Sequence, residues 1–264
     1  ALKPRVNAIV TEARRTLEPE KPFVAAELER TFTVLATDYV LTVLGSSVDR
    51  ILRQEAPGVC LRFAPNTADD AALLREGGAD LAVGIYGSLP PEMRSRQLLT
   101  DRFVCVLRKG HPAAGKRLGL EAFVSLAHIQ VAPRGKPGGY VDDVLRERGL
   151  ERKVARAVPY FLTALSLAAE TDYVLTISER IARRHADSLG LVVHEVPLPL
   201  RPYALGLVWH PRFDEDEAHR FLRDVFVRAA REAAGDRHER PRTQLNPSDP
   251  TSGERRKRPR RSRA

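Results

Sequence analysis

The fold is decided by the stretch Arg30-Thr31-Phe32-Thr33-Val34-Leu35-Ala36-Thr37-Asp38-Tyr39, followed directly by Val40-Leu41-Thr42-Val43-Leu44. In its first half apolar residues alternate with mostly polar ones, which predicts a short and largely buried strand. In its second half apolar residues recur at the spacing of a helix face, and Thr37 and Asp38 have short oxygen-bearing side chains suited to capping a first turn. Ligands of open α/β sheets bind where such strands pass into helices, so we expect this stretch to face a binding cleft.

Strand-then-helix units repeat along the chain after this stretch. Strands that alternate with helices indicate parallel sheets, and two such series indicate two lobes with a cleft between them. The predicted strands are 31–36, 59–64, 80–85, 97–108 (a strand pair or one long strand), 128–132, 153–157, 173–177, 191–196 and 203–209. The predicted helices are 38–54, 68–76, 139–148, 160–170, 178–186 and 214–234.

The length of 264 residues allows one or two domains with a large core. No run of 18 apolar residues occurs and the first twenty residues lack the apolar core of a signal peptide, so we expect a cytoplasmic chain without a membrane segment. The two cysteines, Cys60 and Cys105, both lie in apolar runs. We expect both thiols to be buried and unpaired rather than joined in a disulfide.

The net charge of +9 is concentrated at the end of the chain. Residues 235–264 contain ten Lys and Arg but four acidic residues, and they have few apolar side chains. Such a composition predicts a disordered basic tail. The tail could contact DNA phosphates without sequence preference, or it could be a solvated segment with no dedicated role.

Several phrases, in this order and spacing, resemble the effector-binding domain of LysR-type transcriptional regulators over about residues 1 to 230. The phrases are Arg30-Thr31-Phe32 leading to Ala36-Thr37-Asp38-Tyr39; Ala56-Pro57-Gly58-Val59; Gly78-Ala79-Asp80-Leu81-Ala82-Val83; 101–112, from Asp101-Arg102-Phe103 to Gly110-His111-Pro112; Ala168-Ala169-Glu170-Thr171-Asp172; and Asp216-Glu217-Ala218-His219-Arg220-Phe221-Leu222-Arg223. The resemblance implies an α/β, two-lobed fold like that of periplasmic binding proteins, with two Rossmann-like subdomains joined by two crossing strands. It also implies a small-molecule effector in the interlobe cleft.

The resemblance further implies how the chain is divided. Residues 1–22 correspond to the end of a linker helix and a linker, 23–108 with 206–234 to regulatory subdomain I, 109–205 to regulatory subdomain II, and 235–264 to the basic tail. The family's helix-turn-helix does not precede Ala1 here, so contact with promoter DNA is expected only through a segment that these residues lack. A homodimer or homotetramer is expected, with helices 38–54 and 214–230 as candidate surfaces.

Carried over position by position, the resemblance places one set of residues at the effector cleft. Helix N-termini and backbone N–H groups converge there, which suits a carboxylate or hydroxyl ligand, and the Thr-Asp-Tyr and Pro159-Tyr160-Phe161 phrases resemble the subgroup that senses aromatic or related small acids. The set is Thr37, Asp38, Tyr39, Pro65, Asn66, Thr67, Pro133, Arg134, Gly135, Phe161, Ile177 and Ser178.

Several of these residues also have a simpler interpretation. Asp38 either caps its own helix or selects a ligand with a donor group, because an inward carboxylate would repel an anion. Arg134 either pairs with a ligand carboxylate or is solvated, and Phe161 either stacks on a ligand ring or packs in the core. The segment 67–70 is more typical of a helix cap than of a ligand contact.

The sequence contains no motif of a metal or cofactor enzyme. Its seven histidines include no pair three or four residues apart, and there is no Gly-x-Ser-x-Gly, Gly-x-Gly-x-x-Gly or phosphate-loop sequence. We therefore expect no metal, no cofactor and no catalysis. A solute-binding protein of the same fold is the first alternative, and a small-molecule enzyme on that fold is the second.

Overall fold

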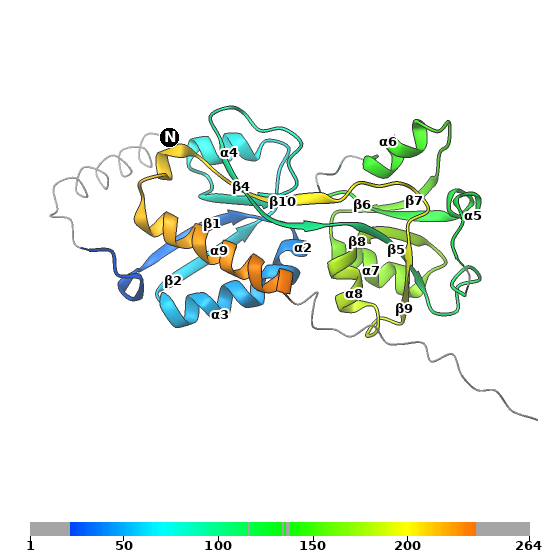
Figure 1. The fold of residues 1–264 in the computed structure, drawn as a ribbon, viewed down its shortest axis with the longest axis horizontal. Helices are drawn as coiled ribbons and strands as arrows, with labels where there is room; N and C mark the ends of the chain where they lie inside the picture. Colours follow the sequence, from blue (N-terminus) through cyan, green and yellow to red (C-terminus); the bar gives the residue numbers. More distant parts are fainter. Residues whose placement is uncertain (1–21, 116, 134, 136–137, 236–264) are drawn as a thin grey trace, which may run out of the picture.

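The computed structural model describes residues 22–235 except 116, 134 and 136–137. The chain forms two lobes that lie side by side along the long axis of the molecule, each built around a five-stranded sheet (Figure 1). The predictions for the linker helix at 1–17, for the basic tail beyond residue 235 and for Arg134 fall outside the described residues.

The first sheet has the strand order β2-β1-β3-β10-β4, and helices α3, α4 and α9 pack against it. Strand β1 lies between β2 and β3 and is parallel to both, whereas β10 is antiparallel to β3 and β4. The strands of this lobe are β1 (Arg30–Leu35), β2 (Val59–Ala64), β3 (Leu81–Gly84), β4 (Arg94–Asp101) and β10 (Tyr203–Trp209). Its helices are α2 (Asp38–Val40), α3 (Ser46–Glu55), α4 (Asp70–Glu76) and α9 (Glu217–Gly235), with one π turn, η2 (Leu41–Gly45), and two 3-10 turns, η1 (Ala25–Glu27) and η3 (Pro211–Phe213).

The second sheet repeats this arrangement with the order β7-β6-β8-β5-β9. Strand β6 lies between β7 and β8 and is parallel to both, and β5 is antiparallel to β8 and β9. The strands are β5 (Phe103–Arg108), β6 (Ala127–Val131), β7 (Lys153–Val158), β8 (Val174–Ser178) and β9 (Leu191–Glu195), and the helices are α5 (Leu120–Ser125), α6 (Tyr140–Arg146), α7 (Phe161–Glu170) and α8 (Glu179–His185).

The chain crosses between the lobes twice, at Arg102 between β4 and β5, and in the segment 196–202 between β9 and β10. The predicted two-lobed fold with two crossings is therefore confirmed. Sheet membership changes at Arg102, earlier than the division at residue 108 suggested by the sequence, and β10 belongs to the first sheet from Tyr203 onward.

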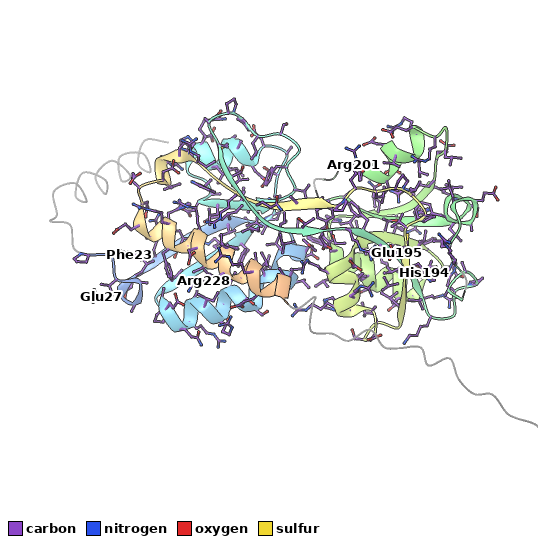
Figure 2. All side chains as sticks on the ribbon, viewed as in Figure 1. Phe23, Glu27, His194, Glu195, Arg201 and Arg228 are labelled. Atoms are coloured by element: carbon purple, nitrogen blue, oxygen red, sulfur yellow. The ribbon has the colours of Figure 1, made fainter. Side chains whose placement is uncertain are left out.

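The core explains why these residues form these elements. Phe32 and Val34 of β1 are fully buried, as their alternation predicts, and Leu44 and Val48 continue the same buried face on the following helix. Along α3 lies α9, and Arg228 of α9 donates two hydrogen bonds of 2.8 Å to the carboxylate of Glu55 at the end of α3 (Figure 2). The two helices thus cover one face of the first sheet as a pair.

Three details differ from the sequence-based expectations. The predicted helix 38–54 is interrupted by the π turn η2, and the short helix α5 was not predicted. The expectation that both thiols are buried is wrong for Cys60, which is exposed, while Cys105 is buried. The reason is that β2 is at the edge of the described sheet, where Cys60 and Arg62 point to solvent while alternate residues pack inward. No helix within the described ranges is long and apolar enough to cross a membrane.

Candidate ligand site at the seam between the lobes

Helix α2, which follows β1, lies on the side of the first lobe that faces the second lobe (Figure 1). Its Asp38 contacts the second lobe. Its carboxylate accepts hydrogen bonds from the backbone N–H groups of Phe161, at 3.1 Å, and Leu162, at 2.9 Å. These are first-turn groups of α7, which have no partner inside their own helix. Asp38 therefore caps a helix of the other lobe.

The expectation that Thr37 and Asp38 cap their own helix is wrong. Thr37 is the N-cap residue of α2, but its side chain makes no capping hydrogen bond. Asp38 is already the first helical residue, so its side chain is directed away from the N–H groups of α2 and toward α7. The half-buried hydroxyl of Thr37 is left at the seam without a capping role.

Tyr39 joins the seam to the crossing strands. It is 3% exposed, its ring centroid lies 5.4 Å from that of Phe161, and its hydroxyl donates to Asp101 Oδ2 at 2.6 Å. Burial away from water raises the pKa of Tyr39, and the nearby hydroxyl of Tyr203 and carboxylate of Asp101 raise it further. Tyr39 is therefore a neutral hydrogen-bond donor at physiological pH.

Asp101 is a shared acceptor for both lobes. Besides the hydroxyl of Tyr39, its carboxylate accepts the backbone N–H groups of Arg102 at 2.8 Å and of Arg180 at 3.4 Å. The hydroxyl groups of Ser178 and Tyr203 are hydrogen-bonded beside it. Of the expected site residues, Ser178 and Ile177 are thus buried at this junction rather than open to solvent.

Asn66 and Thr67 belong to a polar cluster at the carboxyl end of β2. The carboxylate of Asp70 accepts the amide of Asn66 at 2.9 Å, the backbone N–H of Thr67 at 2.6 Å and the hydroxyl of Tyr86 at 2.8 Å. The predicted cap in this segment is confirmed, because Asp69 accepts the backbone N–H of Ala72 at 2.9 Å and caps α4. Pro65, next to the cluster, is exposed.

The loop after β6 carries the remaining candidates. Gly135 is exposed and adopts φ +72°, a left-handed conformation that favours glycine. Gln130 fixes the far end of this loop by donating from Nε2 to the carbonyl of Gly138 at 2.7 Å. Pro133 is half-buried in the same loop.

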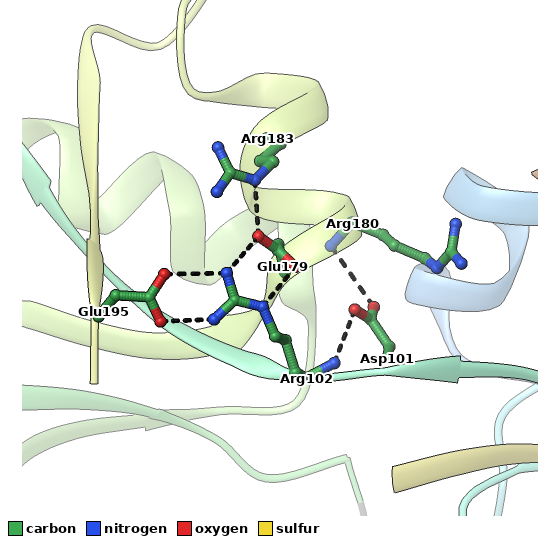
Figure 3. Close-up of polar contacts among 6 residues, drawn as sticks. All are labelled: Asp101, Arg102, Glu179, Arg180, Arg183 and Glu195. Carbon is green, nitrogen blue, oxygen red and sulfur yellow. Dashed lines mark hydrogen bonds and ion pairs between the residues drawn. The ribbon is translucent and has the colours of Figure 1, made fainter. Parts of the chain in front are cut away.

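An ion-pair network beside Asp101 fixes the crossing strand to the second lobe (Figure 3). The guanidinium of Arg102 makes paired hydrogen bonds to Glu179 of α8, at 2.7 Å each, and to Glu195 of β9, at 2.5 and 2.9 Å. Arg183 adds a second cation, with a 2.7 Å bond to Glu179. These hydrogen bonds raise the pKa of Arg102 and bind both carboxylates in the fork geometry that arginine favours.

Two surface hollows are outlined elsewhere in the described part of the chain. One of about 440 Å³ is lined by His111, Leu118, Leu126 and Asp172 of the second lobe among others. The second, of about 220 Å³, lies between α3 and β2 and includes Val48, Leu52, Val59 and Phe63. Neither contains a residue of the expected cleft.

Residues 25–231 match the sequence profile described as the LysR substrate binding domain. The chain belongs to the LysR-type transcriptional regulators. It is 36% identical over 199 residues to the HTH-type transcriptional regulator SyrM of Rhizobium meliloti (strain 1021), an overlap that covers 75% of this chain and 61% of that protein. With the HTH-type transcriptional activator NagR of Ralstonia sp it shares 30% identity over 229 residues, covering 86% of this chain and 75% of that protein.

Solved structures agree with this LysR-type assignment. The probable transcriptional regulator PA0477 from Pseudomonas aeruginosa superposes with a TM-score of 0.76 and 32% identity, covering 84% of this chain and 74% of that chain. The regulatory domain of MexT, a transcriptional activator in the same organism, superposes with a TM-score of 0.68 and 28% identity. The overlap covers 77% of this chain and 100% of that chain. The resemblance inferred from the sequence is therefore confirmed, and this chain contains the effector-binding domain of a LysR-type regulator.

Sequence reasoning missed several residues that shape the site in this LysR-type domain. Asp101, Tyr203 and Glu179 were not among the candidates, although Asp101-Arg102-Phe103 was part of the family-like pattern. Their roles depend on partners far away in the chain, which no local pattern reveals. Within the described ranges, no group of three or more His, Cys, Asp and Glu residues could hold a metal ion.

Proposed function

We propose that this LysR-type domain senses a small molecule with a carboxylate or hydroxyl group, aromatic or short aliphatic, at the seam between the lobes. The observation that carries the proposal is the bond between Asp38 and α7: the first-turn N–H groups of that helix bind a carboxylate at the place where strand ends of both lobes meet. An apolar surface lies beside them, formed by the rings of Tyr39 and Phe161, which are tilted by 37° to each other. Such a combination of a few polar groups and an aromatic wall suits a small aromatic acid.

The proposed site keeps the residues expected from the sequence, with roles that follow from their surroundings. The hydroxyl of Thr37 makes no capping hydrogen bond and can bind the ligand. Phe161 can contact the ligand with its half-buried ring and its backbone N–H. Asn66 and Ile177 are buried, so they would support neighbouring residues of the site rather than contact bulk solvent. The full proposed set is Thr37, Asp38, Tyr39, Pro65, Asn66, Thr67, Pro133, Arg134, Gly135, Phe161, Ile177 and Ser178.

We further propose that the complete protein regulates transcription in the cytoplasm. Promoter contact would be made by a helix-turn-helix outside these 264 residues, which is supported by the names of the relatives and by the 61% of SyrM that the chain spans. The domain itself would carry no catalytic activity and no cofactor, because the relatives named above are regulators.

Self-association is part of the proposal. Strand β2 is at the edge of the sheet in the described residues, and the hollow between α3 and β2, which includes the half-buried Val59 and Phe63, lies on the same side of the first lobe. A homodimer or homotetramer that uses this side is the expected state. Sedimentation that shows only monomer at micromolar concentrations would contradict it.

The ligand proposal is tested with a thermal-shift screen of aromatic and short aliphatic carboxylates. A ligand at a hundredfold excess over its dissociation constant adds roughly 2.7 kcal/mol of stability, which raises the melting temperature by about 5–10 °C in a chain of this size. Thr37→Val and Arg134→Ala should each reduce the shift. The matched control is Thr31→Val, at the exposed opposite end of β1, which should leave the shift unchanged. A hit whose shift survives both Thr37→Val and Arg134→Ala would place the site elsewhere.

A further inference from the structure

Two helices hold equivalent positions in the two lobes, yet they are capped differently. Helix α4 follows β2 and leads to β3, and helix α7 follows β7 and leads to β8, in sheets of matching order. Helix α4 has its own N-cap, because Asp69 accepts the backbone N–H of Ala72. The N-cap residue of α7 is Tyr160, whose side chain makes no capping bond. Its first turn depends instead on Asp38 from the other lobe.

A carboxylate is well suited to this position. The first N–H groups of a helix lack internal partners and carry a partial positive charge, so an acceptor with a negative charge binds them more strongly than a neutral one. Because Asp38 belongs to the first lobe and α7 to the second, the energy of this cap depends on how the lobes are placed relative to each other. In α4 the corresponding energy depends only on local structure.

A second contact starts from the same short segment. The hydroxyl of Thr42 donates to the carbonyl of Asp38 at 2.7 Å, and the carbonyl of Thr42 accepts the guanidinium of Arg184 from α8 at 2.7 Å. Thr42 lies in the π turn η2, where the regular pairing of helical carbonyls is interrupted. Asp38 and Thr42 thus present two acceptors, one turn apart, to two helices of the second lobe.

We propose that Asp38 is an interlobe latch: its carboxylate holds α7 against the first lobe until a carboxylate of the effector takes over the same two N–H groups. Two anionic groups cannot share the N–H groups of Phe161 and Leu162, so an effector bound there displaces Asp38 and frees the lobes to change their relative position. The regulatory half of this proposal rests on the proposed function. The mechanical half concerns the chain without effector and can be tested alone.

The mechanical half is tested by measuring distances between the lobes with two spin labels. The background carries Cys60→Ser, Glu76→Cys on α4 and Glu147→Cys after α6, because residues 76 and 147 are exposed and Cys105 is buried. Asp38→Asn keeps the shape of the side chain and removes its charge. It should broaden the distance distribution and shift it toward longer distances. The matched control is Asp69→Asn, the equivalent cap within one lobe, which should leave the distribution unchanged.

A second measurement, amide hydrogen exchange, is needed in case the distance between the spin labels does not change with small motions of the lobes. In the folded chain, amide hydrogen exchange at Phe161 and Leu162 should become about tenfold faster in Asp38→Asn and stay the same in Asp69→Asn. Unchanged exchange at Phe161 and Leu162, together with an unchanged distance distribution, would overturn the latch and leave the proposed effector site untouched.

The regulatory half is tested on the parent protein with sodium acetate against sodium chloride at equal ionic strength, which separates carboxylate binding from screening. Acetate should broaden the distance distribution as Asp38→Asn does, and it should have no further effect on that variant. If acetate at saturating excess leaves the parent distribution unchanged while Asp38→Asn broadens it, the latch stands and its release by carboxylates is overturned.

Discussion

The two lobes share a strand order but differ in how they support the helix at the seam. In the first lobe α4 is capped by its neighbour Asp69, so its stability is a local property. In the second lobe α7 is capped by Asp38, 123 residues earlier in the chain. The difference shows that a helix capped by a residue of the other lobe has a stability that depends on how the lobes are placed. The chemistry of the two capping hydrogen bonds is otherwise the same.

The largest expected effect comes from removing the acceptor that both lobes share. Asp101→Ala leaves the buried hydroxyl of Tyr39 and the backbone N–H groups of Arg102 and Arg180 without their acceptor. Unpaired buried donors are costly, so we expect a loss of about 4 kcal/mol in the free energy of unfolding, measured by urea titration. A loss below about 1 kcal/mol would show that the lobes do not depend on this junction.

The control for this variant is Asp187→Ala in the second lobe, because Asp187 is exposed and lies away from the junction. Its free energy of unfolding should stay within about 0.5 kcal/mol of the parent. The pair of variants separates the removal of a carboxylate from the removal of an interlobe acceptor.

The next effect depends on pH and concerns the second-lobe core. His128 of β6 is fully buried, its Nε2 donates to the carbonyl of Phe123 at 2.8 Å, and burial lowers its pKa to about 4. The unfolded chain binds a proton at this residue below its ordinary pKa of about 6.5, whereas the folded chain does not until about 4. The free energy of unfolding should therefore fall by up to about 3 kcal/mol between these two pH values.

His128→Gln tests this assignment, because glutamine keeps a donor for the Phe123 carbonyl but does not titrate. The free energy of unfolding of this variant should change less with pH than that of the parent between pH 6.5 and 4. The first lobe has a counterpart in His219 of α9, which is also fully buried with a lowered pKa caused by burial. Equal slopes for parent and His128→Gln would place the acid sensitivity in the first lobe instead.

The sequence predicted local structure better than it predicted partners. Strand β2 was predicted at 59–64, the range it occupies, because its apolar run is bounded by Pro57-Gly58 and by Pro65. The predicted burial of Cys60 was wrong, because a run of apolar residues does not show which face of an edge strand is covered by other elements. The short helix α5 was missed because six residues give too little periodicity to recognise.

The candidate site shows the same division. The sequence placed Asp38 at the end of a strand and the start of a helix, which is where the structure has it. It could not show that the carboxylate reaches α7, because that contact depends on the relative position of two lobes. Asp101 was overlooked as a site residue for the same reason: its partners come from α2, from the crossing strand and from α8.

The smallest expected effect gives α7 a cap of its own and so makes the second lobe resemble the first. Tyr160 is the N-cap residue of α7, has extended backbone angles and is 55% exposed, so Tyr160→Asp places a carboxylate at the standard capping position without opening a cavity. An aspartate N-cap stabilises a helix by about 1 kcal/mol relative to a residue that makes no capping bond. In the Asp38→Asn background, where α7 lacks a charged cap, we expect a gain of this size in urea titration.

In the parent background the same substitution should bring little stability, because a carboxylate at the N-cap accepts from the second or third N–H of the helix and so competes with Asp38 for the N–H of Leu162. The two substitutions should therefore be non-additive, with a coupling energy of about 1 kcal/mol in a double-mutant cycle. Tyr160→Asp alone should also broaden the distance distribution between the lobes, as Asp38→Asn does, while α7 itself stays protected from amide exchange. A stable α7 in a loosened pair of lobes would separate the capping of α7 from the coupling of the lobes. Additive changes in the free energy of unfolding would mean instead that Asp38 and residue 160 bind different N–H groups, and that capping of α7 and coupling of the lobes are not linked.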